Sequence, residues 1–202
     1  MKKSFLLGFS FLLVASISYS QGRTHSGFYF SMGLGPAWGT SNGYDNQGSV
    51  AIITGTGVEF DFQMGGSITK NIILHGTITG KVVAGPQING TVVSDDYSLS
   101  ETMIGGGITH YTPRNFFLTG NLGAGKFTFS QSTGNSYNSN DVSTKYGFSL
   151  LLKAGKEFWI SKKLGLGVAV TYGKTMVNST EGTYTEKWNS NRYGVLLQLT
   201  ID

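Results

Sequence analysis

The sequence predicts an all-β protein: an eight-stranded antiparallel up-and-down transmembrane β-barrel that follows a cleaved signal peptide. Three observations lead there. The chain begins with an export signal, continues in eight runs of alternating apolar and polar residues, and joins these runs by connectors that are alternately short and long. Alternation places apolar side chains on one face of each strand, and the connector pattern is typical of membrane barrels.

The signal occupies residues 1–20. It has a basic start at Lys2 and Lys3, an apolar run over 5–15, and the small residues Ser18 and Ser20 before a cut ahead of Gln21. The apolar run is too short for a transmembrane helix. The barrel domain would therefore occupy residues 21–202.

Composition supports a closed sheet and excludes several function classes. Glycine is frequent (30 residues), proline rare (3) and cysteine absent, which excludes a disulfide framework. Glycine mixed with aromatic and β-branched residues is typical of twisted, closed sheets. The net charge of +4 falls to +2 without Lys2 and Lys3, leaving 13 basic and 11 acidic residues, so no nucleic-acid partner is expected.

The clearest strand pair joins residues 57–64 to residues 72–82. In the first run Val58, Phe60, Phe62 and Met64 share one face, and Glu59, Asp61 and Gln63 share the other. Folding the pair about a turn at 69–71 places Glu59 opposite Lys81, Phe62 opposite Ile78 and Val58 opposite Val82. A pair of opposite charges and pairs of apolar residues at facing positions indicate the correct register. The other six runs are centred on 28–34, 104–108, 118–122, 148–157, 164–170 and 193–199.

The connectors set the orientation. Those at 69–71, 112–115 and 161–163 are short, whereas those at 39–52, 86–96, 131–143 and 178–189 are long and polar. In outer-membrane barrels short turns are periplasmic and long loops extracellular. The pattern therefore predicts a protein of the cell outer membrane that displays four mobile extracellular loops.

Aromatic residues gather at two levels, as the interfacial girdles of a membrane barrel do. The predicted girdle residues are Phe28, Trp38, Tyr111, Phe116, Phe129, Tyr146, Phe158, Trp188 and Tyr193.

The opposite face of the strands is polar and is expected to line a narrow, salt-bridged lumen. Its titratable members are Glu59, Asp61, His75, Lys81, Lys153 and Glu157. A soluble barrel of the lipocalin type would instead need large apolar side chains at these positions. An eight-stranded barrel has little interior room, which favours small and charged groups inside.

One strand breaks the pattern. Strict alternation over 118–129 points Lys126 into lipid, at a cost of about 2–4 kcal/mol at mid-membrane. We expect a β-bulge at 123–125 to turn Lys126 inward and Phe127 and Phe129 outward. The alternative is that Lys126 snorkels to the outer interface.

The sequence offers no catalytic or metal-binding constellation. Barrel enzymes that modify lipid use a histidine-containing set near the extracellular rim, but His25, His75 and His110 all fall toward the periplasmic end of the predicted topology. The acidic residues of the long connectors lack the spacing of a calcium loop. We therefore expect no enzyme activity, no metal and no cofactor.

Residues 27–201 resemble the small outer-membrane barrels of the OmpX and OmpA-transmembrane class, within the broad "porin family" group. The resemblance rests on strand number, connector asymmetry and the last strand, where Arg192, Gly194, Leu197 and Leu199 are similar to the class's assembly signal. It implies the barrel assembly machinery and outer-membrane lipid as partners, and a monomeric protein. The exposed loops could in addition contact an extracellular ligand or surface, which the sequence does not identify.

Three functions remain open from the sequence. The first is a structural or surface-interaction barrel that displays its extracellular loops. The second is a narrow passive channel for small solutes, which the porin label suggests. The third is a lipid-modifying barrel enzyme. Charged pairs that fill the lumen favour the first.

Overall fold

The computed structural model describes residues 25, 27–132 and 139–202. The predicted signal peptide at 1–20 and residues 133–138 of the connector at 131–143 lie outside these residues. In the described part, no helix is long and apolar enough to cross a membrane.

The described residues form eleven strands, of which eight are long. The long strands are β1 (Phe28–Asp45), β2 (Val50–Thr69), β3 (Ile72–Ala84), β6 (Tyr97–Tyr111), β7 (Phe116–Ser132), β9 (Gly147–Trp159), β10 (Leu164–Glu181) and β11 (Tyr184–Ile201). Three short strands, β4 (Gln87–Ile88), β5 (Thr91–Val92) and β8 (Ser139–Ser143), lie in the connectors.

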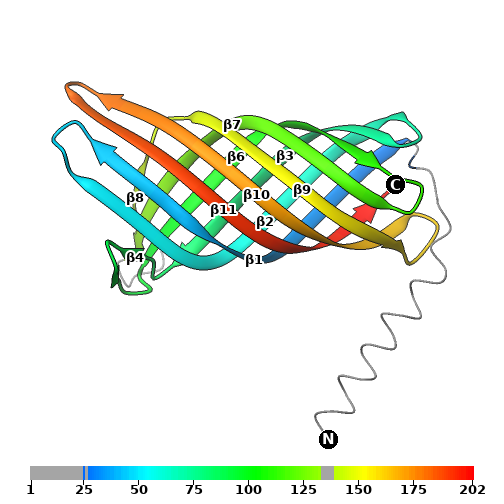
Figure 1. Cartoon of the computed structure of the whole chain (residues 1–202), viewed down its shortest axis with the longest axis horizontal. Helices are drawn as coiled ribbons and strands as arrows, with labels where there is room; N and C mark the ends of the chain where they lie inside the picture. The colour runs from blue at the N-terminus through cyan, green and yellow to red at the C-terminus, as the bar shows by residue number, and fades with distance from the viewer. Residues whose placement is uncertain (1–24, 26, 133–138) are drawn as a thin grey trace, which may run out of the picture.

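The eight long strands close into an antiparallel barrel (Figure 1). Each long strand pairs with the next one along the chain, and β1 also pairs with β11, which leaves the barrel without an open edge. The predicted fold class, an eight-stranded antiparallel membrane barrel, is confirmed.

The register predicted for the first clear hairpin is also confirmed. Glu59 lies opposite Lys81, Phe62 opposite Ile78 and Val58 opposite Val82, and the turn between β2 and β3 falls at residues 70–71. A shift of one residue would have turned every charge of β2 outward, which is why the alternation fixes this register.

Burial follows the alternation around the whole barrel. Leu151 is fully buried inside, whereas its neighbour Leu152 is 43% exposed on the outer wall. The outer wall is apolar over its central part, and its most exposed members include Met64, Leu74, Leu118, Leu122, Val170 and Leu197. An apolar band this continuous suits acyl chains rather than water.

The predicted bulge at 123–125 is wrong. The pairing of β6 with β7 runs without a shift from Tyr97 opposite Gln131 to Tyr111 opposite Phe117. Phe127 is therefore fully buried inside, and Lys126 points outward with its ammonium 5.6 Å from the centre of the Tyr146 ring. An outward lysine costs little near the membrane interface, so no bulge is needed to hide it.

Two of the predicted mobile loops are instead regular hairpins. β1 extends to Asp45 and β2 begins at Val50, while β10 and β11 are separated by only Gly182 and Thr183. The two hairpin tips are joined by Asn46, whose backbone N–H donates to the Thr185 carbonyl (3.0 Å) and whose side-chain amide donates to the Thr183 carbonyl (2.7 Å). We call the four-stranded extension formed by residues 39–52 and 178–191 the hairpin wall; it projects from the left of the barrel in Figure 1.

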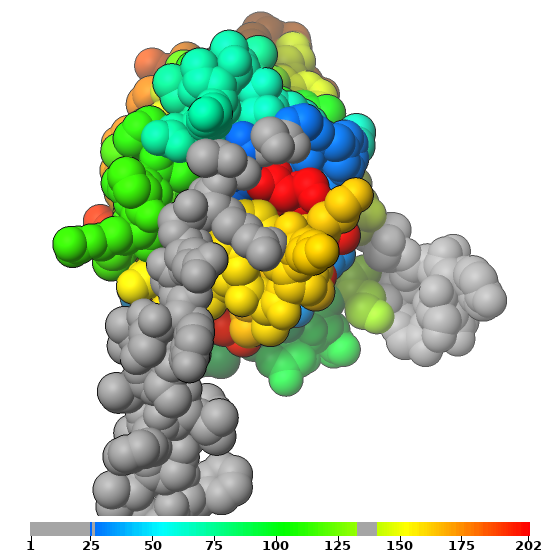
Figure 2. Space-filling model, turned by 90° about the vertical axis from the view of Figure 1, so that its right-hand side faces the viewer, coloured from blue at the N-terminus to red at the C-terminus, as the bar shows by residue number. Residues whose placement is uncertain are grey.

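The opposite end carries the short turns after β2, β6 and β9. In the view onto this end, the last residues of β11 (red) lie between the start of β1 (blue) and the turn between β9 and β10 (yellow) (Figure 2). We refer to the two ends below as the short-turn end and the hairpin end.

Candidate functional site

The barrel interior holds an ionic cluster centred on Arg192 of β11. Its guanidinium lies between two carboxylates, with Nη1 3.1 Å from Glu101 Oε1 and Nε 3.4 Å from Glu59 Oε1. Thr171 donates a hydrogen bond to Glu59 (2.6 Å) and Thr175 donates one to Glu101 (2.6 Å). All three charged side chains are at most 1% exposed, so they are almost entirely removed from solvent.

Two glycines make room for this cluster. A Cβ atom at Gly194 would come within 2.1 Å of Glu59 Oε2, and one at Gly173 within 2.5 Å of Arg192 Nε. Both positions face the interior beside the ion pair. Any larger residue would displace a buried charge from its partner, so packing alone accounts for glycine here.

A second ionic cluster lies nearer the short-turn end. Lys153 Nζ donates to Asp61 Oδ2 (2.7 Å) and to Gln198 Oε1 (2.8 Å). Gln63 and Thr77 donate to the two oxygens of the same carboxylate, at 3.0 and 3.3 Å. This cluster satisfies its charges more completely than the first, since every Asp61 oxygen has a donor.

An aromatic layer fills the interior at the short-turn end. Tyr111 donates to Glu157 Oε2 (3.2 Å), and its hydroxyl lies 3.3 Å from that of Tyr29. His25 stacks on the Tyr111 ring at 3.6 Å between centroids, and its Nδ1 lies 2.6 Å from Asp202 Oδ2. These rings pack against Ile73, Phe117 and Leu196.

An apolar layer fills the interior at the hairpin end. Its buried members are Ile53, Leu99, Phe127, Val177 and Trp188. The Trp188 ring lies 5.8 Å from that of Phe127 and 5.1 Å from that of Phe129. The interior is thus packed at both ends, with two ionic clusters between.

The six titratable residues expected in the lumen, Glu59, Asp61, His75, Lys81, Lys153 and Glu157, all lie inside the barrel and are at most 4% exposed. Their pairing differs from the expectation in one respect. Glu59 lies opposite Lys81 in the register, but its ion pair is made with Arg192, from two strands away across β1.

The sequence reasoning missed two members of the interior. Arg192 was assigned to an assembly signal, and Glu101 to no site. Both could have been found by extending the alternation, because Glu101 has the same parity as the buried Met103, and Arg192 the same parity as the buried Leu196. The assembly role of Arg192, Gly194, Leu197 and Leu199 remains a prediction.

Three of the predicted girdle residues were placed wrongly. Tyr111 and Trp188 point inward and are 1% and 8% exposed, and Phe129 packs against Trp188 inside. They belong to the two interior layers, because each has the inward parity of its strand. On the outer wall, Phe28, Trp38, Phe116, Tyr146 and Tyr193 are all more than 45% exposed, and Phe158 is partly exposed.

The histidines form no reaction centre with access to a substrate. His75 Nε2 lies 3.0 Å from Thr109 Oγ1, but both side chains are buried in the packed interior. His110 points outward at the short-turn end of β6. Among the described residues, no three metal-ligating side chains gather in one place.

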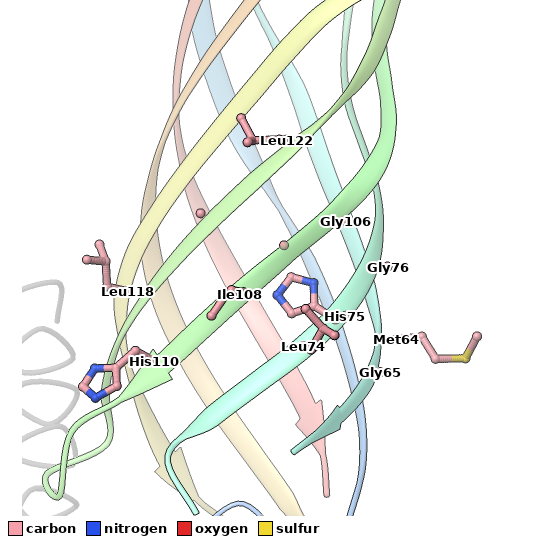
Figure 3. Close-up of a pocket in the computed structure, with 12 residues that line it drawn as sticks. Met64, Gly65, Leu74, His75, Gly76, Gly106, Ile108, His110, Leu118 and Leu122 are labelled. Atoms are coloured by element: carbon pink, nitrogen blue, oxygen red, sulfur yellow. The ribbon is translucent and has the colours of Figure 1, made fainter. Parts of the chain in front are cut away.

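A well-defined cavity lies on the outer wall and not in the lumen (Figure 3). It measures about 810 Å³ and lies over β2, β3, β6 and β7, where Gly76, Gly106 and Gly120 leave the wall thin. Met64, Leu118 and His110 project outward around it in Figure 3. Such a groove faces acyl chains and gives the barrel no passage through its centre.

Comparisons with known proteins identify the fold, but no family and no sequence relative. No protein-family model matches the chain. No curated protein matches its sequence. Among solved structures, neisserial surface protein A has a TM-score of 0.53 at 13% identity, over 87% of this chain and 97% of the other. The outer membrane protein OprG from Pseudomonas aeruginosa has a TM-score of 0.51 at 14% identity, over 90% and 98%. The chain therefore has the fold of small outer-membrane β-barrels.

Proposed function

We propose that this protein is a non-conducting, non-enzymatic outer-membrane barrel that holds the hairpin wall above the cell surface as a recognition element. The short-turn end would face the periplasm and the hairpin end the outside, as in membrane barrels generally. The barrel itself would be the anchor and support of the wall.

The packed interior is the observation that carries this proposal. A solute would have to pass the apolar layer around Trp188, the Arg192 cluster, the Lys153–Asp61 cluster and the aromatic layer around Tyr111 in turn. Each layer spans the narrow lumen of an eight-stranded barrel, whose side chains are enough to fill it. A channel needs a continuous wet path with binding weak enough for release.

The hairpin wall supplies the second part of the argument. Its strands are paired up to Asp45 opposite Glu186 and up to Glu181 opposite Tyr184, so its surface is preorganised. Tyr44 and Tyr184 are 48% and 43% exposed on it, and tyrosine is a favoured contact residue in recognition surfaces. Rigid display lowers the entropic cost of binding relative to a mobile loop.

Conductance across a planar bilayer tests the closed interior. Purified protein, shown to be folded by its shifted electrophoretic mobility before boiling, should give no stable openings. Ohmic steps from the wild-type protein would contradict the proposal and favour the narrow channel.

A hairpin exchange tests the role of the wall. Replacing residues 42–52 and 178–187 by two-residue Asn-Gly turns joins the register partners Ser41 to Ile53 and Val177 to Trp188, and should leave a barrel that still resists SDS when cold. Cells that carry it should lose adhesion to one another and to coated glass, relative to cells with the full protein. Equal adhesion would contradict recognition by the wall, and an altered lipid A mass in wild-type cells would contradict the non-enzymatic assignment.

A further inference from the structure

The outer wall is hollowed on one half of the barrel. The cavity of about 810 Å³ over β2, β3, β6 and β7 adjoins a second one of about 380 Å³, and Met64 and Gly76 line both. We call the larger cavity the wall hollow; its lining includes Met64, Leu74, Gly76, Ile108, Leu118 and Gly120 (Figure 3). On the other four long strands, alternation turns no glycine outward. The hollow is therefore a local feature of the wall.

Two glycines in the floor of the wall hollow are not required by the packing of the barrel. A Cβ atom at Gly76 or Gly120 would come no closer than 3.8 Å to any residue that is not its chain neighbour. A Cβ at the inward Gly105, in contrast, would lie 2.1 Å from the Leu122 carbonyl oxygen. Glycine weakens the interior of a strand and often marks a place where a ligand approaches the backbone closely. The space above Gly76 and Gly120 therefore points to a molecule outside the barrel.

The wall hollow lies in the half of the barrel next to the short turns. Leu122 is the lining residue of β7 farthest from these turns, and it is six residues from Phe116, where β7 begins. At a rise of about 3.3 Å per residue and a tilt of about 40°, this places it about 15 Å from the end of the apolar band. The hollow thus faces a single leaflet of the membrane.

Three basic side chains border the hollow at its short-turn edge. His110, which is exposed and points outward near the end of β6, is part of the lining (Figure 3). Lys70 lies in the turn between β2 and β3, and Arg114 in the turn between β6 and β7; both are exposed. The strand that carries His110 lies between β3 and β7, so the two turns are on either side of it. The hollow therefore ends at a group of cationic residues.

Among the described residues, no exposed acid opposes this charge. The acids of the short-turn end are Glu157, which is buried inside the barrel, and Asp202, whose side chain is 7% exposed and paired with His25. The acids that reach solvent all lie at the hairpin end: Asp45, Asp95, Asp96, Asp141, Glu181 and Glu186. The edge of the wall hollow is thus complementary to an anion.

We propose that the wall hollow binds one anionic glycerophospholipid of the leaflet next to the short turns. Its phosphate would lie beside Lys70, His110 and Arg114, and its acyl chains would fill the two cavities above Gly76 and Gly120. The inference rests on the membrane placement proposed above, in which this leaflet is the periplasmic one. Lysine and arginine bind phosphate, and cations near a membrane surface attract anionic headgroups.

The same charges disfavour a second copy of the chain as the occupant. Two barrels inserted in the same direction and joined through this face would be related by a twofold axis along the membrane normal. Such an interface brings the same patch of both copies together, so Lys70 and Arg114 of one copy would approach those of the other. Like charges at an interface oppose association, whereas an anionic lipid neutralises them.

Filling the hollow tests the apolar part of the site. The mature protein is reconstituted in phosphatidylcholine vesicles that contain phosphatidylglycerol, extracted in mild detergent and examined by native mass spectrometry. Wild type should retain one phosphatidylglycerol. Gly76→Leu, Gly120→Leu should retain none, yet should resist urea in vesicles as well as wild type does, because both new side chains occupy open space. Val170→Phe, which adds bulk to the outer wall on β10, is the control and should retain the lipid.

Three results of this experiment would overturn the lipid site. They are retention by the filled variant, loss of the lipid in Val170→Phe, and unfolding of the filled variant, which would show that the barrel itself needs the glycines. A wild-type dimer that the filled variant lacks would overturn it in favour of a second copy.

Removing charge tests the headgroup part of the site. Lys70→Gln, Arg114→Gln should lower the affinity for phosphatidylglycerol about twenty-fivefold, or about fivefold for each cation. Lys162→Gln, Lys163→Gln is the matched control, because it removes two cations from the same end, in the turn between β9 and β10. This control should bind like wild type. Equal loss in the two variants, no loss in the first, or equal retention of phosphatidylcholine by wild type would contradict a site at the wall hollow.

The two proposals fail separately. A wild-type protein that is SDS-resistant and non-conducting but retains no phosphatidylglycerol removes only the lipid site. A wild-type protein that conducts, or that loses its hairpin wall without loss of adhesion, removes the proposed function and leaves the lipid site in place.

Discussion

On the inner face of the barrel wall acidic and basic side chains are mixed and paired. On the outer face, the only charged residues on the described parts of the eight long strands are Lys126, Lys156, Lys174 and Lys187. Arg192 and Lys153 each contact carboxylates within a dry interior. Lys126 and Lys156 lie against aromatic rings at the edges of the apolar band. The energetic cost of an inner charge depends on whether it has an ion-pair partner. The cost of an outer charge depends on its distance from the centre of the apolar band. The same side-chain chemistry therefore has different energetic consequences on the two faces.

The largest expected effect comes from breaking the inner arrangement at Arg192. Arg192→Met leaves the buried carboxylates of Glu59 and Glu101 without their shared cation, which should destabilise the barrel by about 3–5 kcal/mol. Urea unfolding in lipid vesicles measures this change.

The triple variant Arg192→Met, Glu59→Gln, Glu101→Gln should recover much of the loss, because it removes the unpaired charges together. If Arg192→Met alone unfolds within about 1 kcal/mol of wild type, the buried cluster does not hold the strands together as described.

A new charge on the outer face should have an intermediate effect that depends on depth. Leu152 lies near the middle of β9 and faces outward, so Leu152→Lys should cost about 2–4 kcal/mol. Thr56→Lys, which is outward at the hairpin end like Lys126, should cost about 0–1 kcal/mol. Equal costs at the two positions would show that the outer wall is not layered as an acyl band with interfaces.

The smallest effect is expected in the hairpin wall, where charges are in water. Asp45 accepts hydrogen bonds from the backbone N–H groups of Ser49 (2.7 Å) and Gln47 (2.9 Å), and these bonds, led by Ser49, hold the pKa of its carboxyl below the usual value. A depressed pKa adds stability above the unfolded pKa and loses it as the pH falls through the folded value.

NMR titration of Asp45 should therefore show a pKa below that of a free aspartate, with loss of amide protection at Gln47 and Ser49 only in acid. Asp45→Asn should leave the barrel's unfolding unchanged. A normal pKa for this carboxyl, or a change in barrel unfolding, would contradict a locally stabilised tip.

The sequence predicted the barrel and part of its interior because alternation is strong where one face meets lipid. The β2–β3 register follows from Glu59, Phe62 and their partners, since only one alignment matches both charge and apolar pattern. The inward placement of Lys153 and Glu157 follows from the same rule.

Alternation was less informative at the hairpin end, where both faces of the strands are polar or both contain aromatics. Residues 39–52 read as a loop because Ser, Asn, Gly and Thr give no apolar period, yet their backbone pairs regularly. Phe127 was expected outside because a bulge was invoked to turn Lys126 inward, and Trp188 because it was assigned to the aromatic girdle, but both lie in the interior. The Arg192 pairing was not predictable because it crosses strands that are distant in the chain.

The central claim is that Leu152 and its outward equivalents meet acyl chains while Leu151 and its inward equivalents lie in a closed, dry interior. Because the chain has no cysteine, single variants Leu151→Cys and Leu152→Cys can each carry one spin label without other changes. In lipid vesicles, the label at Leu152 should collide with dissolved oxygen and avoid a water-soluble nickel complex, while the label at Leu151 should meet neither. A label at Leu151 that collides with the nickel complex, or one at Leu152 that does so, would contradict the account.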